Sequence, residues 1–153
     1  MLKRNLFFIL CLLIFFSCSK DKPLYEPQAK IDPYESYKEG FEAFQNNDFF
    51  YANKKFSEAE INFKNPDLAA KSAVMSSFAL YSINLYEEAE ENLTRYLKNY
   101  PADKYVIYAH YLLAIIYFEQ IGEEKHDLKP LLDAREKINF FLEKYPNSEY
   151  AID

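Results

Sequence analysis

Two stretches of this 153-residue chain decide its fold, namely NDFFYANKKFSEA at residues 47–59 and NLYEEAEENLTRY at residues 84–96. They align at a constant offset of 37 residues (47 to 84), with an Ala at the same place in both and a large apolar side chain four residues after it. A third copy places Ala134, Ile138 and Phe141 at the corresponding positions. Repetition at this period predicts pairs of helices that stack as repeated units.

The composition limits the classes of protein that this chain can form. Apolar residues make up 50% of the chain and aromatic residues 18%, whereas only 2 residues are Gly. This apolar fraction predicts a packed core, and the scarcity of Gly argues against Gly-rich nucleotide loops and a turn-dense all-β fold. The formal net charge of -6 argues against binding to a nucleic-acid backbone. We therefore expect proteins or neutral surfaces as partners, and no nucleic acid.

Capping signals and apolar spacing predict that the chain is helical from residue 33 onward. Asp32 precedes Pro33, and Glu35 lies three residues beyond Asp32, which together form a strong helix start. The apolar spacing predicts helices near residues 33–46, 49–63, 67–83, 86–98, 103–121 and 130–144, with a seventh that begins at Ser148. Because the connections are short, we expect neighbouring helices to run antiparallel as hairpins in an all-α fold.

The small residues in these hairpins resemble those of the tetratricopeptide repeat. That repeat needs a small residue in each of its two helices and a Pro that closes the unit. The first small position holds Gly40, Ser77 and Ala114, and the second holds Ala52, Ala89 and Ala134. We therefore expect about three tetratricopeptide-like units in residues 33–153, stacked as a right-handed superhelix, at 33–66, 67–101 and 103–146, with the start of a further helix after them. A plain helical bundle would also place small residues at helix crossings.

The N-terminus carries the pattern of a bacterial lipoprotein leader. A basic start precedes an apolar run over residues 6–16, which is too short to span a hydrocarbon core and is typical of a secretory signal. Ser17 followed by Cys18 resembles a lipoprotein box. This resemblance implies a signal peptide at residues 1–17, cleavage between Ser17 and Cys18, and attachment of fatty acyl chains such as palmitate to Cys18. The alternative is an ordinary signal peptide with an incidental cysteine.

A tether is predicted between the lipid anchor and the first helix. Residues 18–32 contain the acylated Cys18, two prolines and few apolar side chains, which favours an extended and solvated segment. By analogy with enterobacterial sorting, Ser19 implies transport to the periplasmic face of the outer membrane. Because Cys11 and Cys18 are the only cysteines, we expect no disulfide in the body of the protein, no cysteine metal site, and no cofactor apart from the covalent lipid on Cys18.

Two motifs connect these features with a known family. They are Arg95-Tyr96-Leu97 before Tyr100-Pro101, and Tyr145-Pro146-Asn147-Ser148-Glu149-Tyr150-Ala151 near the end of the chain. Together with the lipoprotein box, the tether and the repeats, they resemble the outer-membrane protein assembly factor BamD family, also called ComL. The resemblance implies a non-catalytic, lipid-anchored scaffold of the β-barrel assembly complex that binds unfolded outer-membrane proteins and BamA-like subunits. Family members typically carry five repeats, so the resemblance implies an N-terminal portion or a shortened relative.

A peptide-binding groove is expected on the side of the first helices, because stacked repeats of this kind bind extended peptides on their concave face. The groove-facing positions are predicted to be Tyr34, Tyr37, Phe41, Lys71, Val74, Phe78, Tyr108, Tyr111 and Ile115. Our hypothesis is that these aromatic rings receive an aromatic-rich segment of an unfolded outer-membrane precursor. The alternative is that the rings belong to the core. One helical turn further along, Phe44, Tyr81 and Phe118 are expected to face inward.

No catalytic or metal-binding constellation is apparent in the sequence. Only His110 and His126 are available, no second His shares a helical face with either, and no Ser has a base at a suitable spacing. We expect His110 to be a packing residue, and Glu123, Glu124, His126 and Asp127 to form a solvated acidic loop. Two alternatives stay open, namely an adaptor lipoprotein of pilus assembly or cell division and, more remotely, a periplasmic envelope enzyme.

Overall fold

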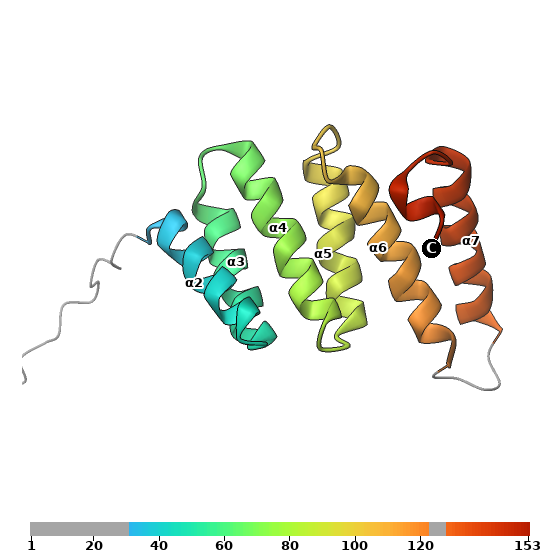
Figure 1. The fold of residues 1–153 in the computed structure, drawn as a ribbon, viewed down its shortest axis with the longest axis horizontal. Coiled ribbons are helices and arrows are strands. Elements are labelled where there is room, and N and C mark those ends of the chain that lie inside the picture. The colour runs from blue at the N-terminus through green and yellow to red at the C-terminus, as the bar shows by residue number, and fades with distance from the viewer. Residues whose placement is uncertain (1–30, 123–127) are drawn as a thin grey trace, which may run out of the picture. The chain divides into compact units, whose positions relative to one another are not determined.

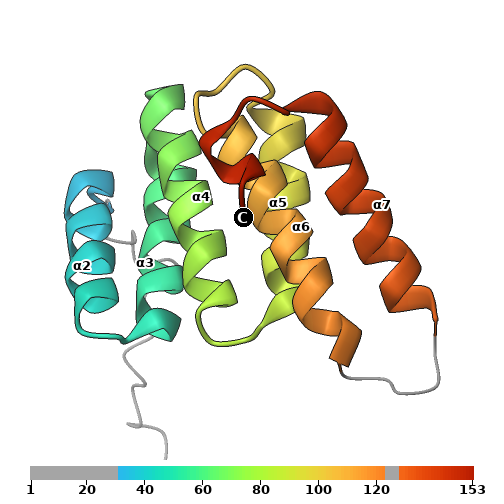
Figure 2. The ribbon, with the colours of Figure 1, turned by 45° about the vertical axis from the view of Figure 1, so that its right-hand side comes forward.

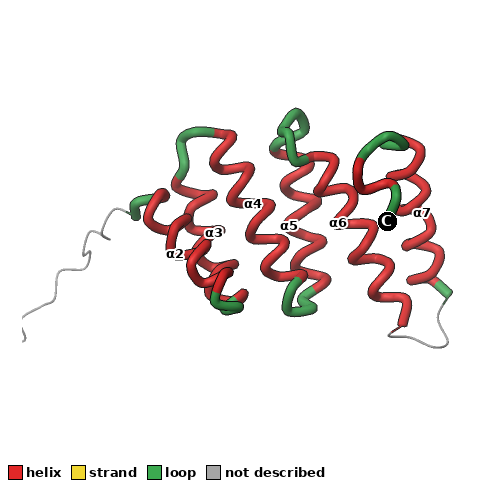
Figure 3. Tube along the Cα trace, in the orientation of Figure 1, coloured by secondary structure: helices red, strands yellow, loops and turns green. Residues whose placement is uncertain are grey.

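The computed structural model describes residues 31–122 and 128–153. The predicted signal peptide, the lipidation site, nearly all of the tether and the acidic loop residues 123–127 therefore lie outside the described residues. Within the described ranges the chain forms six α-helices and two 3-10 helices, with no strand (Figure 3). No helix in these ranges is long and apolar enough to cross a membrane.

The helices follow one another in a row. They are α2 (Pro33–Gln45), α3 (Phe49–Asn62), α4 (Pro66–Tyr81), α5 (Tyr86–Asn99), α6 (Val106–Glu119), η1 (Gln120–Gly122), α7 (Lys129–Lys144) and η2 (Glu149–Ala151). Each α-helix packs against the next one along the chain, so that α2 to α7 lie side by side in chain order (Figure 1, Figure 2). This arrangement confirms the predicted all-α fold of tetratricopeptide-like helical hairpins.

The observed helices differ from the predicted ones mainly at the start of α6. That helix begins at Val106 rather than at residue 103. The carboxylate of Asp103 accepts hydrogen bonds from the hydroxyl of Tyr96 and from the backbone N–H of Tyr105, which holds the chain in a turn before the helix. The predicted seventh helix is a single 3-10 turn, η2, in which Ser148 occupies the N-terminal capping position.

The turns inside the first two hairpins are built identically. Asn47 and Asn84, which are 37 residues apart, both have a φ of 60°. The next backbone N–H in each turn donates to a carbonyl five residues earlier, from Asp48 to Ala43 at 2.9 Å and from Leu85 to Leu80 at 3.1 Å. This is the Schellman pattern, which needs a left-handed residue at the end of a helix, and Asn adopts that conformation more readily than most residues.

Small residues let the helices of each hairpin approach closely. The second small positions, Ala52 and Ala89, are fully buried. Gly40 in α2 faces the buried ring of Phe56 in α3, and a Cβ atom on Gly40 would lie only 2.9 Å from Cδ1 of that ring. The buried apolar side chains form two clusters, a larger one around Leu93 in α4 to α6 and a smaller one around Phe56.

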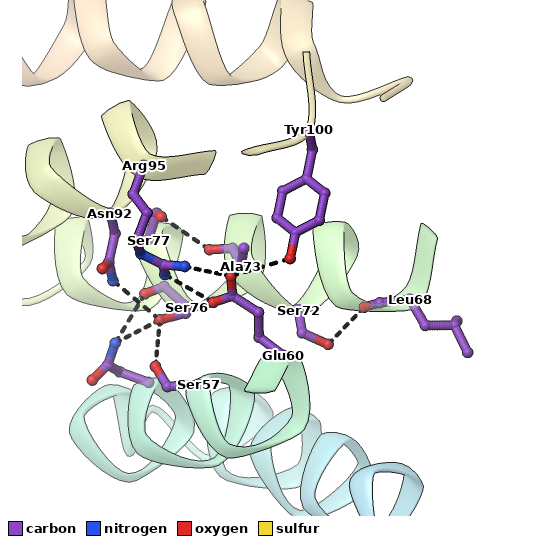
Figure 4. Close-up of polar contacts among 11 residues, drawn as sticks. Ser57, Glu60, Leu68, Ser72, Ala73, Ser76, Ser77, Asn92, Arg95 and Tyr100 are labelled. Atoms are coloured by element: carbon purple, nitrogen blue, oxygen red, sulfur yellow. Dashed lines mark hydrogen bonds and ion pairs between the residues drawn. The ribbon is translucent and has the colours of Figure 1, made fainter. Parts of the chain in front are cut away.

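A polar layer joins α3, α4 and α5 at the junction between the first two hairpins (Figure 4). The hydroxyls of Ser57 and Ser76 are 3.0 Å apart. The carboxylate of Glu60 is buried, and both terminal nitrogens of the Arg95 guanidinium donate to it. The hydroxyl of Tyr100 points at the same carboxylate, with an oxygen–oxygen distance of 3.4 Å. Such two-pronged pairing fixes the geometry of α5 against α3.

Candidate peptide-binding groove

An aromatic hollow of about 320 Å³ lies where α2, α4, the start of α6 and η2 meet. Its walls are apolar except for one lysine and the tyrosine hydroxyls. The lining residues are Phe44, Lys71, Val74, Met75, Phe78, Tyr105, Tyr108 and Tyr150. We call this space the first hollow.

Helical spacing places these side chains in one space. Lys71, Val74 and Phe78 lie three and four residues apart, so they share one face of α4. The ring centroid of Phe78 is 5.6 Å from that of Phe44 in α2 and 6.4 Å from that of Tyr108 in α6. The rings therefore form a continuous aromatic wall across three helices, at the separations typical of aromatic pairs.

Lys71 supplies the only formal charge among the residues that line the first hollow. Its ammonium lies 5.1 Å from the ring centroid of Tyr37, a distance suited to a cation–π contact. The side chain of Tyr37 raises the pKa of Lys71 against the lowering effect of burial. Burial raises the pKa of Tyr108 to about 12, so its hydroxyl stays uncharged. At neutral pH the first hollow thus offers one positive charge within an uncharged aromatic surface.

A second hollow, of about 330 Å³, lies between α6, α7 and η2. Its lining residues are Tyr111, Ala114, Ile115, Phe118, Ile138, Phe141, Leu142, Tyr150, Ala151, Ile152 and Asp153. Tyr150 lines both hollows, and its ring stacks on Tyr111 with the centroids 4.8 Å apart. The hydroxyl of Tyr111 donates to the carboxylate of Asp153 at 3.2 Å. The ring of Tyr150 is therefore shared by the two spaces.

The predicted groove residues divide between these hollows. Lys71, Val74, Phe78 and Tyr108 line the first hollow, and Tyr111 and Ile115 line the second. The three residues predicted in the first unit, Tyr34, Tyr37 and Phe41, line neither.

The first unit contributes less because its rings have other neighbours. Tyr34 packs edge-on against Phe63, with the centroids 5.0 Å apart, and Tyr37 packs on Phe56 at 5.3 Å. Phe41 is 43% exposed. Of these three residues, only Tyr37, through its contact with Lys71, adjoins the first hollow.

Sequence reasoning missed several lining residues. Phe44 and Phe118 are predicted to face inward. Phe44 does pack against the cluster around Phe56 and also lines the first hollow, whereas Phe118 is 56% exposed and lines the second. The expectation for Phe118 is wrong, because its side chain, in the last turn of α6, is more than half exposed. Tyr150 could have been found from the repeat, because it lies 45 residues after Tyr105, which is the offset of Ala134 from Ala89.

The described residues contain no arrangement suited to metal binding. Within residues 31–122 and 128–153, no three His, Cys, Asp or Glu side chains are grouped closely enough to hold a metal ion. His110 is a packing residue, as expected, because its ring lies 5.1 Å from that of Phe140 and 5.6 Å from that of Tyr145. The acidic loop considered from sequence lies outside the described residues.

A row of helical hairpins with small residues at the helix contacts defines the class of tetratricopeptide-like repeat proteins. Residues 29–153 match the family described as outer membrane lipoprotein, YfiO, and the chain belongs to this family.

Two relatives share the name outer membrane protein assembly factor BamD, in agreement with the resemblance drawn from the sequence. The protein of Caulobacter vibrioides is 35% identical over 98 residues, which cover 64% of this chain and 32% of that protein. The protein of Rickettsia prowazekii is 26% identical over 117 residues, which cover 76% of this chain and 47% of that protein. The matched part of the chain thus spans less than half the length of either relative.

Proposed function

We propose that this chain is a non-catalytic scaffold of outer-membrane β-barrel assembly, and that its first hollow receives an unfolded segment of an outer-membrane protein. The observation that carries the proposal is the continuous wall of Phe44, Phe78 and Tyr108, with the Lys71 ammonium beside it. The names of the relatives support the assignment to protein assembly. Partner subunits would include a BamA-like barrel protein.

Binding and positioning would constitute the whole mechanism. Each aromatic or aliphatic side chain that a peptide buries in such a hollow contributes about 1.5–3 kcal/mol, so a few anchors give micromolar affinity after the cost of ordering the peptide. Acyl chains on Cys18 would hold the domain at the periplasmic face of the outer membrane after cleavage next to Ser17. The tether would let the helical units stand away from the lipid surface.

Peptide binding to hollow variants tests this proposal. A fluorescent peptide that copies an aromatic-rich terminal strand of an outer-membrane barrel should bind the protein, and Phe78→Ser should weaken binding about tenfold or more, because it removes the central ring of the wall. Fluorescence anisotropy measures the affinity, and circular dichroism checks the fold.

Phe41→Ser is the matched control, because this ring is exposed and lies outside both hollows. It should leave the affinity nearly unchanged. Equal affinities for the protein and a folded Phe78→Ser variant would contradict the proposal, as would an equal loss in Phe41→Ser.

A further inference from the structure

The two junctions between successive hairpins use equivalent sequence positions but differ in chemistry. An offset of 37 residues relates α3 to α5 and α4 to α6 (47 to 84), and an offset of 45 relates α5 to α7 (89 to 134). At the first junction these positions hold Ser57, Glu60, Ser76, Asn92 and Arg95. At the second junction the same positions hold Thr94, Leu97, Leu113, Lys137 and Phe140. Residues that hydrogen-bond to one another are thus replaced largely by apolar ones.

Polar contacts close the first junction. Figure 4 shows the Arg95 guanidinium and the Glu60 carboxylate facing each other across it. Ser76 lies between its neighbours, 3.0 Å from the hydroxyl of Ser57 and accepting a hydrogen bond from Asn92 Nδ2 at 3.3 Å. These polar side chains therefore find their hydrogen-bond partners within the chain.

The second junction is open. A hollow of about 420 Å³ lies there, which we call the junction hollow, and its lining residues are Thr94, Leu97, His110, Leu113, Glu136, Lys137 and Phe140. Its floor is apolar, because Leu113 is buried and Leu97 is half-buried. Phe140 stands at the rim with 43% of its surface exposed. No residue at this junction forms the counterpart of the Glu60–Arg95 pair, because the two positions hold Leu97 and Phe140.

Two lysines and one carboxylate lie beside the junction hollow. The ammonium of Lys144 lies 5.0 Å from the ring centroid of Phe140, and Lys137 lines the hollow itself. After burial, these two lysines are the causes that lower the pKa of His110. Glu136 is the one carboxylate among the lining residues. A ligand with negative charge beside an apolar side chain is therefore complementary to this surface.

We propose that the junction hollow is a second docking site, which binds an acidic segment of a partner protein with a large apolar side chain at its centre. The apolar side chain would cover Leu97, Leu113 and Phe140, and the flanking carboxylates would meet Lys137 and Lys144. This site is separate from the first hollow. On α6, Tyr108 and His110 are two residues apart and so project about 200° from each other. The proposal does not depend on which peptide the first hollow binds.

The test uses two peptides and a variant that closes the junction hollow. The probes are a fluorescein-labelled hexapeptide with Leu-Phe flanked on each side by two glutamates, and its counterpart with lysines in place of the glutamates. The acidic peptide should bind at least about tenfold more tightly than the basic one. Leu97→Glu combined with Phe140→Arg, which copies the Glu60–Arg95 pair, should abolish binding of the acidic peptide because the new side chains fill the hollow and pair with each other.

Two further variants separate loss of the site from loss of the fold. Lys137→Glu combined with Lys144→Glu keeps the apolar floor and should reverse the preference, so that the basic peptide binds more tightly. Phe41→Ser, at an exposed position that lines none of the three hollows, should leave binding of the acidic peptide unchanged. Equal binding of the two peptides, or no binding of the acidic one, would overturn the proposal. Unchanged binding to the folded junction-closing variant would also overturn the proposal. If that variant fails to fold, the peptide preference of the Lys137→Glu and Lys144→Glu double variant tests the proposal instead.

Discussion

At Gly40, the absence of a side chain fixes the distance between two helices. The ring of Phe56 occupies the space that a Cβ atom on Gly40 would need, and it is fully buried. That ring also lies 5.3 Å from the ring of Tyr37. Because interiors are close-packed, the ring cannot move aside without displacing other core side chains.

We therefore expect Gly40→Leu to destabilise the protein by about 2 kcal/mol or more, because overpacking outweighs the gain of about 1 kcal/mol in helix propensity. Urea unfolding followed by circular dichroism measures the change. Phe41→Leu, at the next and exposed position, should change the free energy of unfolding by less than about 0.5 kcal/mol. Equal effects of the two substitutions would show that helix contact does not depend on residue 40.

At the scale of the helices, the helix starts that depend on local capping residues could be predicted from the sequence. The helix start that depends on a tertiary contact could not. Asp32, Asp48 and Asn65 each accept a hydrogen bond from a backbone N–H in the first turn of the helix that follows, so the starts of α2, α3 and α4 are predictable to within a residue. The start of α6 is not, because Asp103 is held in its turn by Tyr96 on the preceding helix. That contact has no local signature.

The candidate groove could be predicted only in part for a related reason. Helical spacing tells which side of α4 carries Lys71 and Phe78, and these two residues do line the first hollow. Spacing cannot tell where neighbouring units leave space between them. Tyr150, which the repeat offset indicates but helical spacing does not, closes the wall from a segment far along the chain, and Phe41 lines neither hollow. Whether any of these residues binds a peptide stays a prediction.

The contact between α6 and α7 should respond to pH through His110. Burial, followed by the nearby charges of Lys144 and Lys137, lowers the pKa of this histidine below its ordinary value of 6.5. The unfolded chain therefore binds the proton at higher pH than the folded one does. Titration of His110 should therefore leave the free energy of unfolding unchanged above about pH 6.5. The free energy of unfolding should fall as the pH drops from there through the lowered pKa. The melting temperature should accordingly be lower at about pH 5.5 than at about pH 7.5.

His110→Phe is the control for this prediction. It keeps an aromatic ring against Phe140 and Tyr145 but removes the titrating group. The variant should lose less stability than the parent protein between the two pH values, as measured by thermal unfolding. Since His126 is present in both proteins, the difference between their pH slopes belongs to residue 110. Identical slopes would mean that His110 does not couple to folding.

At the scale of the described helical units, stability depends on how well neighbouring hairpins are joined. In repeat proteins, stability is approximately the sum of the stability of each unit and of the contacts between neighbours. The first junction is joined by the buried carboxylate of Glu60 and its guanidinium partner Arg95, whereas apolar side chains line a hollow at the second. Removing one member of a buried pair costs more than the pair itself contributes, because the other charge is left without compensation.

Arg95→Ala should therefore loosen the first hairpin from the rest. Because Arg95 is partly exposed, we expect a cost of about 2 kcal/mol, at the low end for a buried pair. Hydrogen exchange of backbone amides in α2 and α3 should become about tenfold faster or more, while exchange in α6 and α7 changes little. Lys98→Ala removes an exposed charge one turn later on α5 and should leave all six helices as protected as before. If exchange accelerated equally in every helix, the hairpins would unfold as one cooperative unit and the junction would not be a separate element of stability.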